Sequence, residues 1–289
     1  MNAIVKKGIP ALVCCLASLG AGQAVAADWS DTSLSWRYGT KFAEPFNTQD
    51  IAKNILGLTH VSGYKYGTNF FNADLLMSDS KDPGSLTQKS GAQEVYVVYR
   101  HTLDIGKLQG SEIKFGPIKG VGATFGFDYN AKNDVGYNSR KRMLVAGPTL
   151  MWDVPGHLST SLLILNESNA PSGPFPPISN VSGRYTYKTH PMLAVVWGIP
   201  IGSLPLSFEG FALFIANKGK DETGADTAAE TNIDMQLMWD AGLAAGMPKG
   251  TLKLGLEYQY WKNKFGNPAS IAGPGSFAKT PMIRAEYHF

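Results

Sequence analysis

The chain has 289 residues, of which 26 are basic and 23 acidic, with two cysteines, 32 glycines and 11% aromatic residues. Without Lys6 and Lys7 the balance is 24 to 23, a net charge of +1 in place of +3. A chain whose basic and acidic residues are so nearly equal in number is not expected to bind a nucleic-acid duplex or another polyanion. Because Cys14 and Cys15 both lie near the N-terminus, the rest of the chain excludes a disulfide framework, a thiolate metal site and a cysteine nucleophile.

Residues 1–26 have the three parts of a secretory signal peptide. Lys6 and Lys7 carry its positive charge, residues 9–19 form the apolar region, and the small residues 24–26 form a cleavage site. The apolar region is shorter than the roughly 20 residues that a membrane-spanning helix needs. We therefore expect residues 1–26 to be a signal peptide and residues 27–289 to form one mature domain.

The rest of the chain divides into runs in which apolar and polar residues alternate with the period of two of a β-strand. Turn-forming residues bound each run, and no stretch approaches the length of a membrane-spanning helix. We count about twelve runs, at residues 33–42, 55–65, 68–78, 92–104, 118–131, 142–153, 157–167, 187–200, 204–217, 230–241, 250–263 and 279–289.

The alternation indicates a strand with one face toward lipid. In the first run, Leu34, Trp36 and Tyr38 alternate with smaller or polar residues. A charged side chain that faces lipid costs about 2–4 kcal/mol at the bilayer midplane, so the apolar set must face outward and the polar set inward. We predict an all-β protein, a transmembrane antiparallel up-and-down β-barrel of about twelve strands, surrounded by the lipid of the bacterial outer membrane.

Loop lengths support this topology. Long polar connections at 44–54, 79–91, 132–141, 167–186, 218–229 and 264–277 alternate with short turns at 66–67, 154–156, 202–203 and 247–250. Outer-membrane barrels have long external loops and short periplasmic turns. The connection at 106–116 departs from the rule because it falls on the short-turn side and is long.

The last run ends on an aromatic residue. Ile283, Ala285, Tyr287 and Phe289 would share one face of a final strand. A terminal aromatic residue is the usual ending of outer-membrane barrels, where the insertion machinery reads it. We therefore expect the barrel-assembly machinery to be a partner through Phe289.

Three stretches resemble the Tsx-type nucleoside-specific channel family, including its OmpK-like members. Residues 102–119, with a Lys-Leu pair at 107–108 and Phe-Gly-Pro at 115–117, look like that family's long periplasmic turn. Residues 197–201 are similar to its aromatic-x-x-Pro-Ile strand end, and residues 286–289 to its aromatic-x-Phe terminus. The resemblance implies a monomeric twelve-stranded barrel with a narrow channel for nucleosides, and in some members a docking site for phages or colicins.

The polar phase of the strands predicts the lining of the lumen. Its acidic members are Asp74, Glu94, Asp128, Asp153, Glu209, Asp234, Asp240, Glu257 and Glu286. Its basic members are Arg37, Lys41, Arg100, Arg142, Lys253 and Arg284. A lining of both signs favours a neutral polar solute over a dedicated ion or phosphate pore.

Aromatic side chains in the same phase offer stacking surfaces, since a base on an aromatic ring gains about 1–3 kcal/mol. The candidate substrate-binding residues are Phe70, Tyr96, Phe211 and Trp261 as stacking rings and Arg37, Glu94, Arg100 and Glu257 as polar partners. The alternative is that the rings pack against other side chains and the charges form ion pairs that hold the barrel open. We expect passive diffusion of nucleosides or similar small polar solutes, without a cofactor.

Two other functions are compatible with a barrel. A lipid-modifying enzyme would need a serine and a histidine together with an acid, and neither His101 nor His157 has such a partner in its phase. We therefore predict no enzyme and no catalytic residue, and the scattered histidines predict no metal site. A structural or docking barrel would use its loops, for which the proline-rich segment 171–177 is a stiff candidate.

Overall fold

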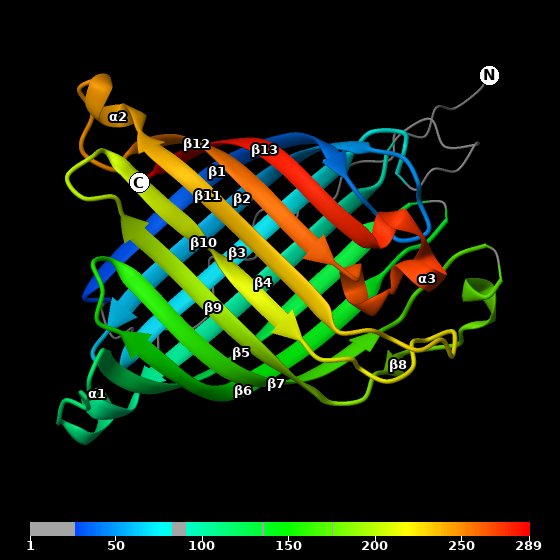
Figure 1. Ribbon diagram of the computed structural model, residues 1–289, viewed down its shortest axis with the longest axis horizontal. Coiled ribbons are helices and arrows are strands. Elements are labelled where there is room, and N and C mark those ends of the chain that lie inside the picture. The colour runs from blue at the N-terminus through cyan, green and yellow to red at the C-terminus, as the bar shows by residue number, and fades with distance from the viewer. Residues whose placement is uncertain (1–26, 83–90, 135, 175) are drawn as a thin grey trace, which may run out of the picture.

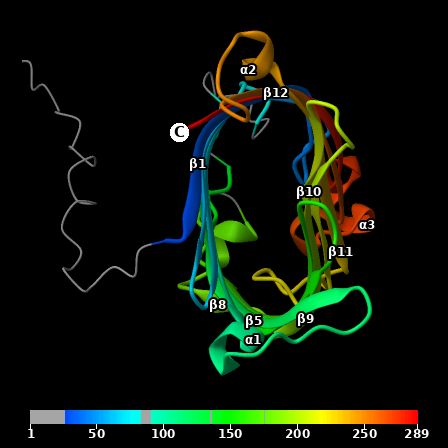
Figure 2. The ribbon, with the colours of Figure 1, turned by 90° about the vertical axis from the view of Figure 1, so that its left-hand side faces the viewer.

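The computed structural model describes residues 27–82, 91–134, 136–174 and 176–289, so the expected signal peptide at 1–26 lies outside the described residues. Twelve long strands form one antiparallel sheet that closes into a barrel (Figures 1 and 2). Each long strand pairs with the next long strand in the chain, and β1 pairs with β13 to close the ring. The predicted fold class and number of strands are confirmed.

The described strands are β1 (Trp29–Phe42), β2 (Ile51–Tyr64), β3 (Gly67–Ser78), β4 (Gln93–Asp104), β5 (Ile118–Asn133), β6 (Arg140–Trp152), β7 (His157–Asn169), β8 (Tyr185–Thr186), β9 (His190–Pro200), β10 (Leu206–Ile215), β11 (Glu230–Asp240), β12 (Leu252–Lys262) and β13 (Phe277–His288). The short helices are α1 (Ile105–Gln109), η1 (Ile178–Asn180), α2 (Ala241–Ala244), η2 (Lys264–Gly266), α3 (Ala269–Ala272) and η3 (Pro274–Ser276). The two-residue β8 pairs with the end of β7 and is not a member of the ring.

The two ends of the barrel differ in their connections. The short-turn end carries α1 and α2, and the long-loop end carries α3 and β8 (Figure 1). The long connection expected at 106–116 is confirmed, because β4 ends at Asp104 and β5 begins at Ile118. It begins with α1, whose N-cap Asp104 accepts a hydrogen bond from the backbone of Lys107. The expectation of a short turn at 247–250 was wrong, because β11 ends at Asp240 and α2 precedes the turn.

The outer surface of the strands is apolar over the middle of the barrel. Leu34 on β1 is 54% exposed, and Leu256 on β12 is 65% exposed; β13 lies between these two strands. Other exposed apolar residues are Leu56, Leu58, Leu75, Val95, Phe127, Leu144, Leu162, Ile164, Leu193, Phe214, Leu237, Leu254 and Ile283. No helix in the described part of the chain is long and apolar enough to cross a membrane. A closed sheet with an apolar outer surface satisfies every backbone group within lipid, and the chain is a barrel of the bacterial outer membrane.

Two residues assigned to the lumen from the sequence face outward. The pairing of β1 with β2 shifts between Gly39 and Phe42, so the bulge turns Phe42 inward and Lys41 outward. In β6 the inward phase runs through Lys141 and Met143, which leaves Arg142 exposed on the outside. Lys141 and Arg142 are adjacent bases, so alternation of polarity did not distinguish which of them points inward.

Candidate functional site

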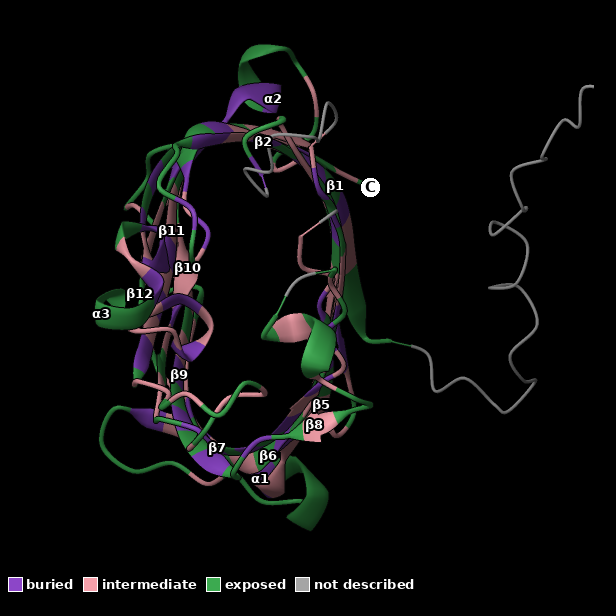
Figure 3. Ribbon diagram, turned by 90° about the vertical axis from the view of Figure 1, so that its right-hand side faces the viewer, coloured by how far each residue is buried: buried purple, intermediate pink, exposed green. Residues whose placement is uncertain are grey.

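The interior of the barrel holds a cavity of about 1220 Å³ lined by all twelve long strands. Segments of the long connections cross the barrel's outline when it is viewed from the long-loop end (Figure 3). All eight candidate residues predicted from the sequence line this cavity, namely Arg37, Phe70, Glu94, Tyr96, Arg100, Phe211, Glu257 and Trp261.

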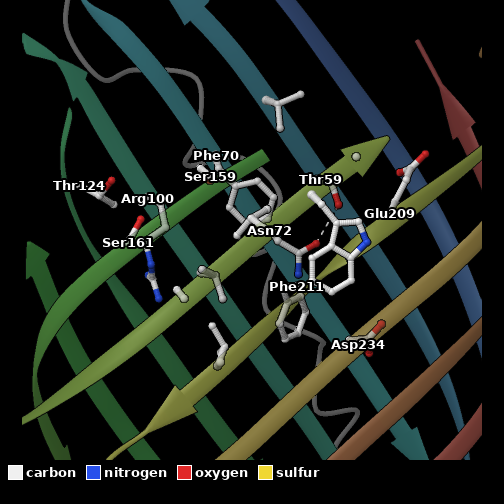
Figure 4. A pocket seen from close by; sticks show the side chains of 18 of the residues that line it. Thr59, Phe70, Asn72, Arg100, Thr124, Ser159, Ser161, Glu209, Phe211 and Asp234 are labelled. Atoms are coloured by element: carbon white, nitrogen blue, oxygen red, sulfur yellow. Dashed lines mark hydrogen bonds between the residues drawn. The ribbon is translucent and has the colours of Figure 1, made fainter. Parts of the chain in front are cut away.

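Phe70 and Phe211 project into the cavity from opposite walls (Figure 4). Phe70 is on β3 and Phe211 on β10, six strands apart around the ring. The Phe70 side chain is 38% exposed although it points inward, so its ring faces the open lumen. Neighbouring strands place a charged group beside each ring, because Arg100 pairs with Phe70 and Asp234 with Phe211.

The other two rings are held by neighbours in the wall. The Tyr96 hydroxyl donates a hydrogen bond to Asp128 at 2.8 Å, and Arg100 forms an ion pair with the same carboxylate at 2.5 Å. The Trp261 indole donates to Glu230 at 2.6 Å, and its ring packs edge-on against Phe265 with centroids 4.8 Å apart. The rings of Tyr96 and Trp261 therefore pack against neighbouring side chains, whereas those of Phe70 and Phe211 are better placed to contact a solute.

A chain of ion pairs follows the wall formed by β12, β13 and β1. Arg284 lies 2.8 Å from Glu257 and 2.5 Å from Glu286, and Glu286 is 3.2 Å from His288. Arg37 continues the chain, 3.6 Å from Glu257 and paired with Asp74 on β3. Each arginine lies between two carboxylates, so charges of both signs alternate along this wall.

A different wall of the lumen is apolar. We define the apolar strip as the inward-facing side chains Met143, Val145, Leu163, Leu165, Met192, Ala194, Val196, Phe211, Leu213 and Ile215 of β6, β7, β9 and β10. Val145, Leu163, Leu165, Met192 and Ala194 are buried against one another. Val196 is 40% exposed and lies beside Phe211, its partner on β10. The opposite wall carries the polar side chains Arg37, Thr59, Asn72 and Asp74. Toward the long-loop end that wall also has an apolar cluster, made of Phe42, Ile51, Ile55, Met282 and Leu76.

Three lysines from distant parts of the chain surround Glu44 at the long-loop end. Its carboxylate lies 2.6 Å from Lys53 and 3.0 Å from Lys264, with Lys132 at 3.9 Å. Burial opposes ionisation of Glu44, but the three ammonium groups outweigh it and hold the pKa of Glu44 well below its usual range. We call this group the Glu44 cluster. It joins the first connection to the walls of β2 and β5 and to η2.

A second, half-buried carboxylate, that of Glu222, ties three of the long connections together. Glu222 accepts hydrogen bonds from the hydroxyls of Tyr137 at 2.7 Å and Tyr187 at 2.5 Å, and from the Asn169 amide at 3.0 Å. Burial opposes ionisation, yet the bonds from Tyr187 and Tyr137 lower the pKa of Glu222. Burial beside this carboxylate raises the pKa of Tyr137 well above its usual value, so its hydroxyl stays a donor.

His157 and His101, the two histidines considered for an enzyme, contact neutral groups. His157 Nε2 lies 3.2 Å from the Ser159 hydroxyl, with no carboxylate hydrogen-bonded to its ring among the described residues. His101 faces outward, where its ring contacts the Tyr64 hydroxyl at 2.8 Å and the Asn69 amide oxygen at 2.7 Å. Over the described ranges, no group of His, Cys, Asp and Glu side chains could hold a metal ion.

Sequence comparisons find no matching family model and no matching curated protein. Several solved structures resemble the barrel at low identity. The KdgM porin is 10% identical, with 89% of this chain and 99% of that chain covered and a TM-score of 0.44. The translocator domain of the autotransporter NalP from Neisseria meningitidis is 10% identical over 93% and 90%, with a TM-score of 0.44. OccK11 (OpdR) from Pseudomonas aeruginosa is 10% identical over 90% and 96%, with a TM-score of 0.33. At this distance these resemblances say nothing about a solute.

Proposed function

We propose that the protein is a passive channel through which nucleosides or similar small polar solutes diffuse across the outer membrane. The observation that carries the proposal is the placement of Phe70 and Phe211 on opposite walls of a lumen whose lining includes both apolar and hydrogen-bonding side chains. A nucleoside combines a flat ring system, which can stack on an aromatic side chain, with hydroxyls that need donors and acceptors.

The two sides of the cavity suit the two parts of such a solute. The apolar strip reaches Phe211 from the long-loop end, so a flat base could contact Leu213, Val196 and Phe211 in turn. Across the lumen, Thr59 and Asn72 offer hydroxyl and amide groups to a sugar. Contacts of this kind are individually weak, which a channel needs because it must also release its solute.

The ionic lining supports a neutral solute. Arg37, Arg284 and Arg100 are each paired with a carboxylate, so they do not form a ladder of free cations for a phosphate or a polyanion. The carboxylates of Asp74, Asp128, Glu257 and Glu286 are engaged by the same arginines, which disfavours a dedicated cation pore. The ion pairs instead hold the wall in place around the solute.

A second candidate function is a docking barrel whose external loops bind a large partner such as a phage or a colicin. The favouring observation is that Glu222 joins the connections that contain Tyr137 and Tyr187, and β8 adds a further strand to β7. The external surface is thus organised by side-chain contacts. The two functions are compatible in one molecule, but the docking role requires no open lumen.

Solute uptake distinguishes the two functions. The full chain, refolded into liposomes, is mixed with isosmotic adenosine, uridine, glucose or serine, and the swelling rate is recorded. The channel proposal expects swelling with all four and a nucleoside rate above that of a sugar of smaller mass. Swelling rates that follow solute size alone would reject nucleoside selectivity but would still support a channel. No swelling with any solute would reject the channel and favour the docking barrel.

A further inference from the structure

Three exposed arginines gather on the outside of the barrel at its long-loop end. Arg140 and Arg142 are on β6, and Arg184 directly precedes β8. One Nη1 atom of Arg184 donates to the Arg140 carbonyl oxygen at 2.9 Å and to the Ser168 hydroxyl at 3.2 Å. Ser168 is the pairing partner of Arg142 across the β6–β7 ladder. The three residues therefore form one contiguous patch, which we call the arginine patch.

Among the described residues, no carboxylate forms an ion pair with an arginine of the patch. In the described part of the chain, the arginines that form ion pairs with a carboxylate are Arg37, Arg100 and Arg284, all inside the lumen. Burial and the guanidinium groups of Arg142 and Arg140 lower the pKa of Arg184, as expected of like charges held close together. Arg184 is nonetheless fixed by its two hydrogen bonds. Guanidinium groups held together in this way lack the anion that would relieve their repulsion.

The surface directly beneath the patch is apolar and faces lipid. One step along β6 from Arg142 toward the short-turn end lies Leu144, which is 64% exposed. Leu144 pairs with Phe127 on β5, 42% exposed, and with Asn166 on β7; the next outward residue of β7, Ile164, pairs with Ala146 and is 52% exposed. The arginines thus lie at the upper edge of the lipid-facing belt, on the side where the long external connections place the outer leaflet. A ligand that matches both features has an anionic head and acyl chains.

We propose that the arginine patch binds the phosphorylated headgroup of an outer-leaflet glycolipid, with the lipid's acyl chains lying along Leu144, Phe127 and Ile164. Guanidinium groups bind phosphate oxygens through paired, charge-assisted hydrogen bonds, and a cluster of basic residues beside a lipid belt is the expected form of a headgroup site. This lipid contact is independent of the solute that passes through the lumen.

The test measures binding of bis-phosphorylated lipid A to the refolded full chain in detergent by native mass spectrometry. The Arg142→Gln/Arg184→Gln double variant is expected to bind lipid A about tenfold more weakly than the unaltered chain. Arg142→Lys keeps the positive charge but loses the forked pair of guanidinium donors, so its affinity for lipid A is expected to lie between those of the unaltered chain and the double variant. Because both arginines are exposed, the variants should retain the barrel, which heat-modifiable gel mobility confirms.

Lys279→Gln is the matched control, because Lys279 is an exposed cation near the long-loop end of β13, on a strand that does not pair with β6. It should leave lipid A binding unchanged. Dephosphorylated lipid A should bind the unaltered chain as weakly as lipid A binds the double variant, and inorganic phosphate should not compete at millimolar concentration. Equal loss from Lys279→Gln, undiminished binding by the double variant, or equal competition by free phosphate would each overturn the proposal.

Discussion

Glu44 and Lys264 are 220 residues apart in the chain, yet Lys264 Nζ lies 3.0 Å from the Glu44 carboxylate and also donates to the Ala43 carbonyl oxygen at 2.9 Å. The contact joins the first long connection of the barrel to the last. Lys53 and Lys132 lie around the same carboxylate and also pair with Asp82, at 3.5 and 2.7 Å. The long-loop end is therefore held by an ionic cluster in which Glu44 contacts all three lysines.

Replacing Glu44 by Gln should loosen this end of the channel. The substitution removes the carboxylate partner of Lys264 and leaves Lys53 and Lys132 sharing Asp82, and breaking a buried ion pair costs about 3–5 kcal/mol. We expect more frequent conductance fluctuations of single channels in planar bilayers. Glu112→Gln is the control, since Glu112 is 79% exposed at the short-turn end, and it should leave the current trace unaltered.

The Glu44 cluster also predicts an acid response. The pKa of Glu44 is depressed well below its ordinary value of 4.5, so its stabilisation is complete above pH 4.5 and is lost only as the pH falls through the lower, folded-state pKa. Channel fluctuations of the unaltered chain should remain constant from pH 7 to pH 4.5 and increase below it. Onset near pH 6 would show that a histidine rather than Glu44 controls the change.

Glu222→Gln should release the external connections from one another. The bonds from Tyr137 and Tyr187 to a charged acceptor become bonds to a neutral one, with a loss of about 1–2 kcal/mol. We expect faster hydrogen exchange of backbone amides in residues 216–229, measured by mass spectrometry, with strand amides unchanged. Uniform acceleration through the barrel would contradict a local role for Glu222.

Arg37→Gln should make the lumen more selective for cations. The substitution removes a positive charge that faces both Asp74 and Glu257, so two carboxylates gain net negative potential. The reversal potential under a tenfold KCl gradient should move toward the potassium equilibrium value. Arg142→Gln removes an equal charge from the outer surface, where the structure places it, and should not change the reversal potential. A shift with Arg142→Gln would restore the lumen assignment made from the sequence.

The role of the apolar strip in solute binding can be tested with the same valine-to-threonine substitution at two positions. Val196→Thr places a hydroxyl in the strip at a side chain that is 40% exposed, beside Phe211. It should weaken nucleoside block of the current by about threefold, because one methyl contact with the base becomes polar. Val98→Thr makes the same change on β4, which lines the lumen away from the strip, and should leave block unchanged. Equal effects would mean that the strip has no role in solute binding.

The strand pattern was readable from the sequence because lipid and water impose opposite requirements on alternate residues. All twelve runs correspond to strands, with ends that differ by four residues or fewer. The prediction of which side chains face the lumen was wrong at Lys41. A bulge there shifts the register by one residue and so reverses which side chains point inward. A bulge leaves no mark on polarity when the residues around it include Gly39 and Thr40, which suit either face.

The candidate site was recovered only in part. Alternation placed Phe70 and Phe211 in the lumen, but it could not show that their strands stand on opposite walls. The apolar strip was missed because a polar lumen was assumed. Its signal is present in runs that are apolar on both faces, such as residues 162–165 and 192–197. The Glu44 cluster had no signal at all, since Glu44 and Lys264 lie in connections, where no periodicity fixes a direction.

Single-channel conductance with adenosine titrated against the unaltered chain, Phe70→Ala and Phe211→Ala tests the central claim most directly. We predict saturable block of the current by adenosine and weaker block by glucose. Each alanine variant should raise the adenosine concentration at half block by about 5- to 150-fold, the range of a lost stacking contact. A conducting channel whose current is indifferent to adenosine, or whose block survives both substitutions, would contradict the claim.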